Sequence, residues 1–354
     1  MRAQLLSRRI IPGLVLIALA SLAHAADLPA LHAALFKRAM AAPRVAASPA
    51  DSVAFFLSGW MLTGDETCLK AAQEQLTRSH GHINRDGLYE EGLVDGSNIV
   101  RMLATADHLL AYWIACQLLE DRKMRVHLDR CVEGMVQSLA RQPVRATNGQ
   151  VYTLFAPMYD APKPYEVAVA ADIAPQRSAA LGLVFTLLYH DEKSKWFHDE
   201  TIKDIALNEL HASMATQRLQ SGAILPDGSA TEAQADPAVG AAVLFAWSWA
   251  NRFWQEPDTE IRIRRAVDWL DPYFDGRAMT PQAMWQVFAA FADHGRDLHR
   301  LMGLYEVSLA DVRSTPACGQ AYLYLMGLPA DLLRLTGLSG KWLPVPPAVH
   351  QGQP

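Results

Sequence analysis

Acidic, tyrosine and histidine side chains gather in the segment 80–96 of this 354-residue chain. The side chains of that segment that could take part in catalysis or substrate binding are His82, Tyr89, Glu90, Glu91 and Asp95. Cleavage of a glycosidic bond needs two carboxyl groups, one protonated and one ionised. Neighbouring glutamates point in different directions, so at most one of Glu90 and Glu91 would face a shared cleft. The segment therefore predicts one catalytic carboxylate, and the alternative is a solvated acidic loop whose acids cap a helix.

Two further segments, 142–173 and 218–236, supply the candidates Tyr165, Asp172 and Asp227, and Gln176 and Arg177 follow in the first turn of the helix after 142–173. Aromatic rings suit the apolar faces of sugars, and a guanidinium can pair with a carboxylate. Asp172 lies two to three residues before an expected helix, where it could equally act as a cap. Asp227 lies in the turn Leu225-Pro226-Asp227-Gly228. These acids are candidate partners for the carboxylate of the first segment.

Metal, nucleotide and nucleic-acid chemistry lack sequence support. His80-Gly81-His82 could begin a metal site, but no third ligand has a convincing spacing, and the chain has no C-x-x-C motif. It also lacks the glycine-rich nucleotide motifs, H-E-x-x-H and G-x-S-x-G. No basic run is interleaved with aromatics, as nucleic-acid binding would favour. We predict no metal and no cofactor, and leave the oligomeric state open.

The first 25 residues have the features of a signal peptide. Arg2, Arg8 and Arg9 precede an apolar run, and Ala23-His24-Ala25 offers the small residues of a cleavage site. The run is too short for a membrane span, although a retained anchor is the alternative. Cleavage would leave 29 basic against 37 acidic residues, a formal charge of −8. We expect a bacterial protein that is periplasmic or secreted, with no stable membrane span after cleavage.

Four cysteines would remain after cleavage: Cys68, Cys116, Cys131 and Cys318. An oxidising compartment permits disulfides. The first three lie among apolar neighbours in helical patterns, where free buried thiols are equally ordinary. The sequence therefore leaves open whether these cysteines form disulfides or remain free thiols.

Six very apolar helices must position the candidate residues. They are expected at about 49–63, 97–119, 174–190, 237–254, 281–293 and 316–328. Five begin with a proline, which suits the first turn because that N–H has no helical partner. Residues Ser48, Asp236, Thr280 and Thr315 precede four of these prolines as expected N-caps, and Ser97 is the expected cap of the second helix.

Each apolar helix is followed by an acidic turn and a one-sided helix. In 121–141, apolar residues recur at three- and four-residue spacing. Helices that are apolar all round must be buried, so the alternation predicts an inner ring within an outer layer, completed by helices at about 28–41 and 330–337. The alternative is a generic helical bundle or irregular solenoid. Only 150–155 is typical of a strand.

Short motifs add a resemblance. The segment 62–72 resembles the helix–turn–helix connection of the (α/α)6-toroid, or six-hairpin, carbohydrate-active superfamily, and Asp86-Gly87-Leu88-Tyr89 and Leu225-Pro226-Asp227-Gly228 resemble its loops before inner helices. The resemblance implies an all-α toroid over 26–345, followed by a tail at 346–354. It also implies an exported protein that acts on glycans, an architecture shared by hydrolases, lyases and epimerases.

We therefore predict a glycoside hydrolase acting on a polysaccharide or oligosaccharide, with a carboxylate pair drawn from the five acids above. The first alternative is a uronate lyase or epimerase, which needs a cation and a base. Arg177 with Tyr165, or His80 and His82 with Tyr89, could supply these, although the charge of −8 disfavours an anionic polymer. The second is a non-catalytic glycan-binding or scaffold toroid of an envelope polysaccharide system.

Overall fold

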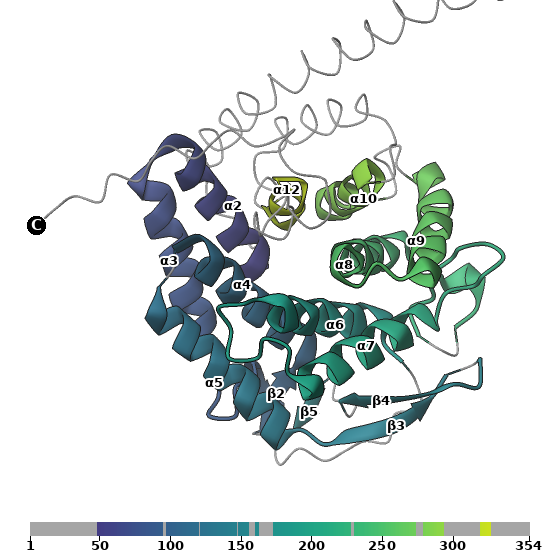
Figure 1. Ribbon diagram of the computed structural model, residues 1–354, viewed down its shortest axis with the longest axis horizontal. Coiled ribbons are helices and arrows are strands. Elements are labelled where there is room, and N and C mark those ends of the chain that lie inside the picture. Colours follow the sequence, from purple (N-terminus) through teal and green to yellow (C-terminus); the bar gives the residue numbers. More distant parts are fainter. Residues whose placement is uncertain are drawn as a thin grey trace, which may run out of the picture.

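Six helices form a closed ring in a computed structural model that describes residues 48–94, 97–119, 121–146, 148–155, 160–162, 173–227, 230–273, 279–293 and 319–326. They are α2 (Pro49–Thr63), α4 (Met102–Leu119), α6 (Pro175–His190), α8 (Pro237–Trp254), α10 (Pro281–Asp293) and α12 (Gly319–Met326). Each packs against the next, and α12 packs against α2 (Figure 1). The ring predicted from the apolar helices is confirmed.

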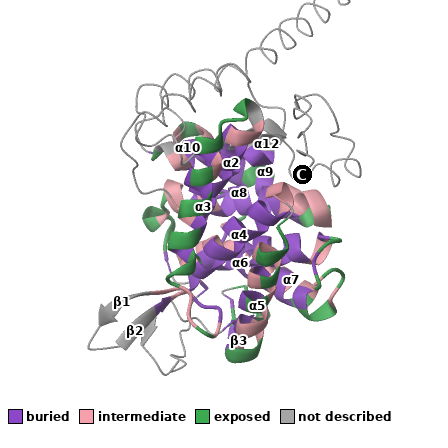
Figure 2. Cartoon of the chain, turned by 90° about the vertical axis from the view of Figure 1, so that its left-hand side faces the viewer, coloured by how far each residue is buried: buried purple, intermediate pink, exposed green. Residues whose placement is uncertain are grey.

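Four outer helices cover this ring: α3 (Glu66–His80), α5 (Arg122–Ser138), α7 (Glu200–Met214) and α9 (Pro257–Leu270). Each packs against the inner helix that precedes it in the chain. The inner helices are mostly buried, whereas the outer ones alternate buried and exposed faces (Figure 2). The helices expected at 28–41 and 330–337 lie outside the described residues, as do the cleavage site and the tail.

The helix ends follow the predicted capping chemistry, with one correction. The Ser48 and Asp236 side chains accept the N–H groups of Asp51 and Ala238, as N-caps do. The prediction that Ser97 caps a helix is wrong. Residues Ser97–Arg101 form a strand, and α4 begins only at Met102.

Two small sheets accompany the helices. One has the order β1 (Glu90–Val94), β2 (Ser97–Arg101), β5 (Asp160–Pro162), and the other pairs β3 (Arg141–Arg145) with β4 (Val151–Phe155), all antiparallel. The strand β2 leads directly into α4, and β4 packs against the outer helix α7. The predicted arm at 150–155 is confirmed as β4. The other strands were missed because β1 and β3 are rich in charged residues, glycine and proline, which have low strand propensity.

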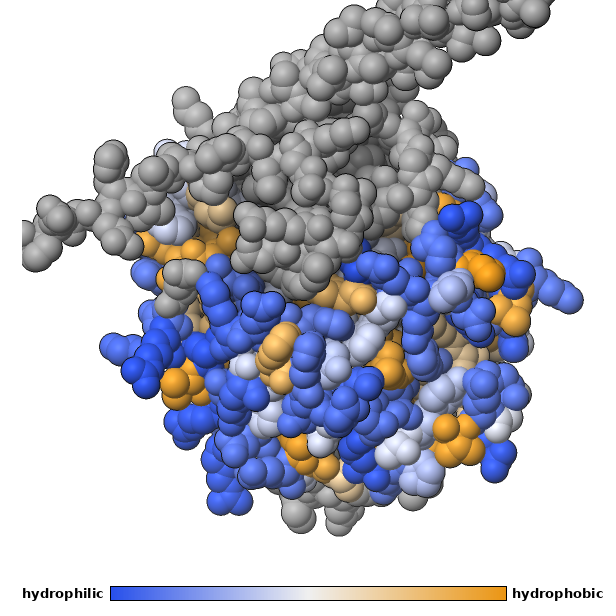
Figure 3. All heavy atoms as spheres, in the orientation of Figure 1, coloured by the Kyte–Doolittle hydropathy of each residue, from blue (hydrophilic) through white to orange (hydrophobic). Residues whose placement is uncertain are grey.

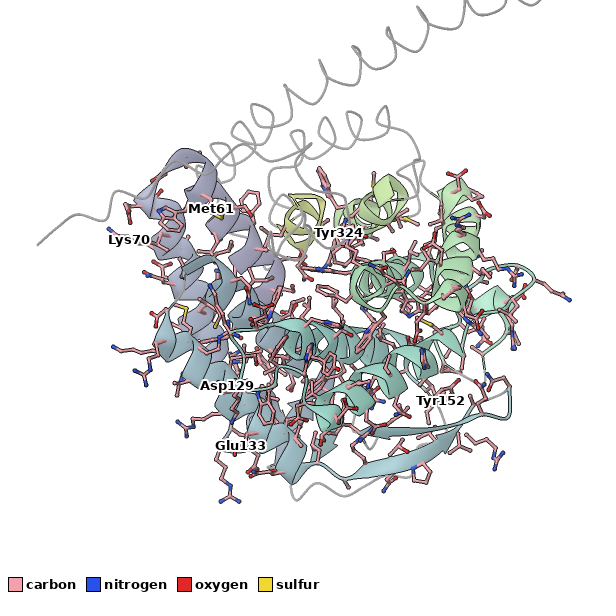
Figure 4. The ribbon with its side chains drawn as sticks, in the orientation of Figure 1. Met61, Lys70, Asp129, Glu133, Tyr152 and Tyr324 are labelled. Atoms are coloured by element: carbon pink, nitrogen blue, oxygen red, sulfur yellow. The ribbon has the colours of Figure 1, made fainter. Side chains whose placement is uncertain are left out.

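Aromatic side chains fill the interior of the ring. The rings of Trp113 and Trp249 lie 6.4 Å apart between centroids, and Tyr324 lies 5.8 Å from Trp249. Figure 4 shows Tyr324 on α12, on the ring side of that helix. By length and composition α4 could cross a membrane, but 67% of its residues are buried in the protein, as is typical of a core helix.

The described surface is mainly polar. On the face in Figure 3, apolar side chains form small, separate groups between hydrophilic ones. The described cysteines Cys68, Cys116 and Cys131 are buried free thiols. Cys318 lies outside the described residues. The apolar content of the chain is therefore used mainly inside the ring.

Candidate functional site

Two aspartates approach each other at the N-terminal ends of the inner helices. Asp51 lies in the first turn of α2, and Asp107 lies in the second turn of α4. Asp51 is only 1% exposed. Asp107 is partly exposed as a residue, although its carboxyl group is buried. Both carboxyl groups therefore lie near the N-terminal end of the inner ring.

Asp51 is held by hydrogen bonds from three elements. The Gln282 Nε2 amide donates to Asp51 Oδ2 at 2.6 Å, and the Gln320 backbone N–H donates to Oδ1 at 3.3 Å. The Ser48 hydroxyl donates to Oδ2 at 3.1 Å. Because Gln282 and Gln320 lie in the first turns of α10 and α12, this carboxyl group links three inner helices.

Asp107 is bound to the start of α2. The Ala50 backbone N–H donates to Asp107 Oδ2 at 3.0 Å, and the Ser48 hydroxyl lies in hydrogen-bonding contact with both aspartates. Asp107 thus satisfies one of the N–H groups that have no partner within α2. The two carboxyl groups share one serine and sense each other's charge.

This environment separates the protonation behaviour of the two acids. Burial, and then the charge of Asp107, raises the pKa of Asp51 to about 8 against the opposing effect of its hydrogen bonds. Burial raises the pKa of Asp107 to about 6. At neutral pH Asp51 retains its proton while Asp107 is largely ionised, which is the division needed for general acid–base chemistry.

The acids predicted from sequence occupy other positions. Glu90 lies on β1, where the Asn84 Nδ2 amide donates to its Oε1 at 2.5 Å. Glu91 also lies on β1, paired with Ile99. Asp227 is partly exposed in the loop before α8. Asp95 and Asp172 lie outside the described residues. Their catalytic roles stay predictions.

The predicted binding residues that the structure describes lie beside β1 and in the first turn of α6. The His82 and Tyr89 rings are stacked with centroids 4.9 Å apart, beside Glu90. Gln176 is partly exposed in the first turn of α6. Arg177, the next residue, is 3% exposed. Tyr165 lies outside the described residues.

Arg177 faces a carboxylate of the protein itself. Its charge opposes the rise that burial causes in the pKa of Glu209 on α7. Glu209 Oε1 also accepts the backbone N–H of Phe155 at 3.1 Å. This buried pair therefore joins α6, α7 and the end of β4.

Asp51 and Asp107 escaped the sequence interpretation, although a signal exists. Asp51 follows Ser48-Pro49-Ala50 in the first turn of the helix predicted at 49–63, where an acid is an ordinary helix-start residue. Asp107 is the one charged residue in the apolar stretch 102–119. A charge in a helix that is buried all round needs a partner or a function. That criterion would have selected Asp107.

A separate groove of about 1050 Å³ lies on the outer side of the molecule, between α7, α9 and β4. His211 Nε2 and Glu256 Oε2 are 2.9 Å apart there. Figure 4 shows Tyr152 of β4 at this outer hairpin, beyond α7 and away from the ring. The groove does not include either aspartate.

Solved structures share this architecture. No family model matches the chain, and no curated protein matches it in sequence. A family 76 glycoside hydrolase from a bovine Bacteroides thetaiotaomicron strain is similar, with a TM-score of 0.54 at 9% identity over 78% of this chain and 68% of that one. The fold is the (α/α)6 toroid. A D-mannose isomerase has a TM-score of 0.53 at 10% identity over 79% of this chain and 87% of its own. At such identity the likeness establishes the toroid alone.

Proposed function

We propose that this toroid is a carbohydrate-processing enzyme, and specifically a glycoside hydrolase that uses Asp51 as general acid and Asp107 as base or nucleophile. The observation that carries the proposal is the meeting of these two carboxyl groups around Ser48 at the inner-helix N-termini. One carboxyl would protonate the leaving oxygen, while the other would activate water or attack the sugar.

The surroundings of the pair favour hydrolysis over uronate elimination. Elimination needs a cation to neutralise the substrate carboxylate. Gln282 and Gln320, which contact Asp51, are neutral, and the charge of buried Arg177 is matched by Glu209. Carboxamides instead suit the hydroxyl groups of a neutral sugar.

The fold and the N-terminus lend further support. Two toroids of similar structure are, by name, a glycoside hydrolase and a D-mannose isomerase. The basic and apolar N-terminal segment ending at Ala25 supports export. We propose that the mature protein meets a polysaccharide or oligosaccharide in the periplasm or outside the cell.

A polysaccharide and oligosaccharide panel tests this function. Parent protein is incubated with each glycan, and new reducing ends, unsaturated products and isomerised free sugars are measured separately. We expect new reducing ends alone. Asp51→Asn and Asp107→Asn should each lower the rate by about 10²–10⁴-fold, the usual contribution of a general acid or base.

A matched variant controls for loss of a carboxylate as such. Asp199 caps α7 at the opposite end of the ring, accepting the N–H groups of Thr201 and Ile202. Asn caps helices about as well as Asp, so Asp199→Asn should keep the parental rate. Reducing ends released at the parental rate by both Asp51→Asn and Asp107→Asn would refute the assignment. Unsaturated or isomerised products would refute hydrolysis itself.

A further inference from the structure

A second cluster of reactive side chains lies between the inner and outer helices, apart from the aspartate pair. His108 of α4 and His127 and Cys131 of α5 place one ligand atom each within 4.8 Å of the others. His127 Nε2 lies 3.0 Å from His108 Nε2 and 3.4 Å from Cys131 Sγ. Around a tetrahedral Zn²⁺ with ordinary bond lengths, neighbouring ligand atoms are about 3.3–3.6 Å apart. The two distances from His127 Nε2 are close to that spacing.

Several polar atoms converge on a single imidazole nitrogen. Besides His108 and Cys131, His80 at the end of α3 brings its Nδ1 to 3.3 Å from His127 Nε2. A neutral imidazole nitrogen carries one proton or one lone pair, so it can serve one of these three atoms well. A cation between His108, His127 and Cys131 would instead accept a lone pair from each of these three residues.

The surroundings orient His108 as a ligand. Its Nδ1 lies 2.6 Å from the hydroxyl of Ser79, which is 2% exposed. With the Nδ1 proton donated to Ser79, the lone pair of Nε2 points towards His127. A second hydrogen bond of this kind fixes most metal-binding histidines. The Tyr112 ring, with its centroid 4.3 Å from that of His127, packs against the second imidazole.

The backbone also brings the ligands together. His127 and Cys131 are four residues apart on α5 and therefore lie on one face of the helix. The loop before β1 packs closely on this turn, because a Cβ atom at Gly87 would lie 2.3 Å from the Cys131 carbonyl oxygen. This contact fixes the loop after α3 against the turn of α5 that carries Cys131.

From this geometry we propose that the protein binds one Zn²⁺ ion through His108 Nε2, His127 Nε2 and Cys131 Sγ, with water as the fourth ligand. Imidazole and thiolate are the ligands that Zn²⁺ prefers, whereas Ca²⁺ and Mg²⁺ require oxygen. On binding, the Cys131 thiol proton leaves to solvent as the Zn–S bond forms. The ion would join α4 and α5, and the site is independent of the proposed hydrolysis.

Metal titration of the full, tag-free protein tests this site. Metal is removed with a chelator, and Zn²⁺ is returned in competition with a chromophoric chelator. We expect one ion per chain, a Kd tighter than about 1 µM, and a higher Tm with Zn²⁺ than without. Co²⁺ in place of Zn²⁺ should give visible bands of tetrahedral geometry and a near-ultraviolet thiolate-to-cobalt band.

Two cysteine variants make the test specific. Cys131→Ser should abolish the thiolate-to-cobalt band and weaken Zn²⁺ binding by at least about 10–100-fold, the loss that even a supporting partner causes. Cys68→Ser, which alters another buried thiol on α3, should retain both the band and the affinity. Absence of binding by the parent, or a thiolate band that persists in Cys131→Ser, would overturn the proposal.

Discussion

Asp51 should make the protein less stable as the pH rises, and replacing it with asparagine should remove that dependence. The folded state raises the pKa of this carboxyl from 3.8 to about 8. Below pH 3.8 Asp51 is protonated in both the folded and the unfolded state, so it adds no pH dependence to the stability. Between the two values the folded state holds a proton that the unfolded state has lost, so the free energy of unfolding falls as the pH rises.

The size of this effect follows from linkage. One proton of difference changes the free energy of unfolding by about 1.4 kcal/mol per pH unit. From pH 5 to pH 7, the stability of the parent relative to Asp51→Asn should therefore fall by roughly 3 kcal/mol. Taking the difference between the two proteins cancels other groups, including the buried His108 and His190, whose pKa values are lowered by burial.

Urea unfolding, followed by tryptophan fluorescence at several pH values, measures this difference. The carboxamide oxygen introduced by Asp51→Asn would still accept the Gln320 N–H, so the variant should fold. Asp107→Asn removes the second cause of the raised pKa of Asp51 and should move the pH-dependent range downwards. A stability difference that stays constant from pH 5 to pH 7 would show that Asp51 is not a protonated buried acid.

Substitutions at Gly319 and Arg177 test how the inner helices pack. Gly319→Ala would place a Cβ atom 2.0 Å from the Asp51 carbonyl oxygen and should cost about 1–3 kcal/mol of stability, measured by urea unfolding. Gly81→Ala is the control, because its Cβ atom would lie 3.3 Å from the nearest atom and should change urea unfolding little. Arg177→Met removes the positive charge with the larger effect on buried Glu209, leaving that of Arg141, and should cost about 3 kcal/mol of stability in urea unfolding. Adding Glu209→Gln should recover part of this loss, and equal losses for the single and double variants would contradict the pairing.

The architecture was predictable because it depends on periodicity. The proline and cap at each inner-helix start placed 49–63, 237–254 and 281–293 at their observed bounds. The strands β1 and β2 were not predicted, since their stability comes from pairing between Val94 and Ser97 and with β5 rather than from propensity. Asp-Gly at 95–96 was the available hairpin signal.

The sites were less predictable because they join residues far apart in the chain. Asp51 meets Gln282 and Gln320, more than 200 residues away. The His80-Gly81-His82 segment predicts no metal site, because no third ligand has a convincing spacing in the sequence. His108 and His127 lie on different helices, and the packing of α5 against α4 brings their Nε2 atoms to 3.0 Å from each other. Spacing rules cannot detect ligands contributed by separate helices.

Helix α4 links the two proposed sites for a physical reason. Buried polar groups are usually hydrogen-bonded, and three polar side chains of this inner helix find partners in different directions. Asp107 bonds to the start of α2, and the next residue, His108, points to α3 and α5. Gln117 bonds to Asp191 after α6. Charged and imidazole side chains in a helix that is otherwise apolar are therefore informative positions of this sequence, since Asp107 and His108 each mark a specific contact between helices.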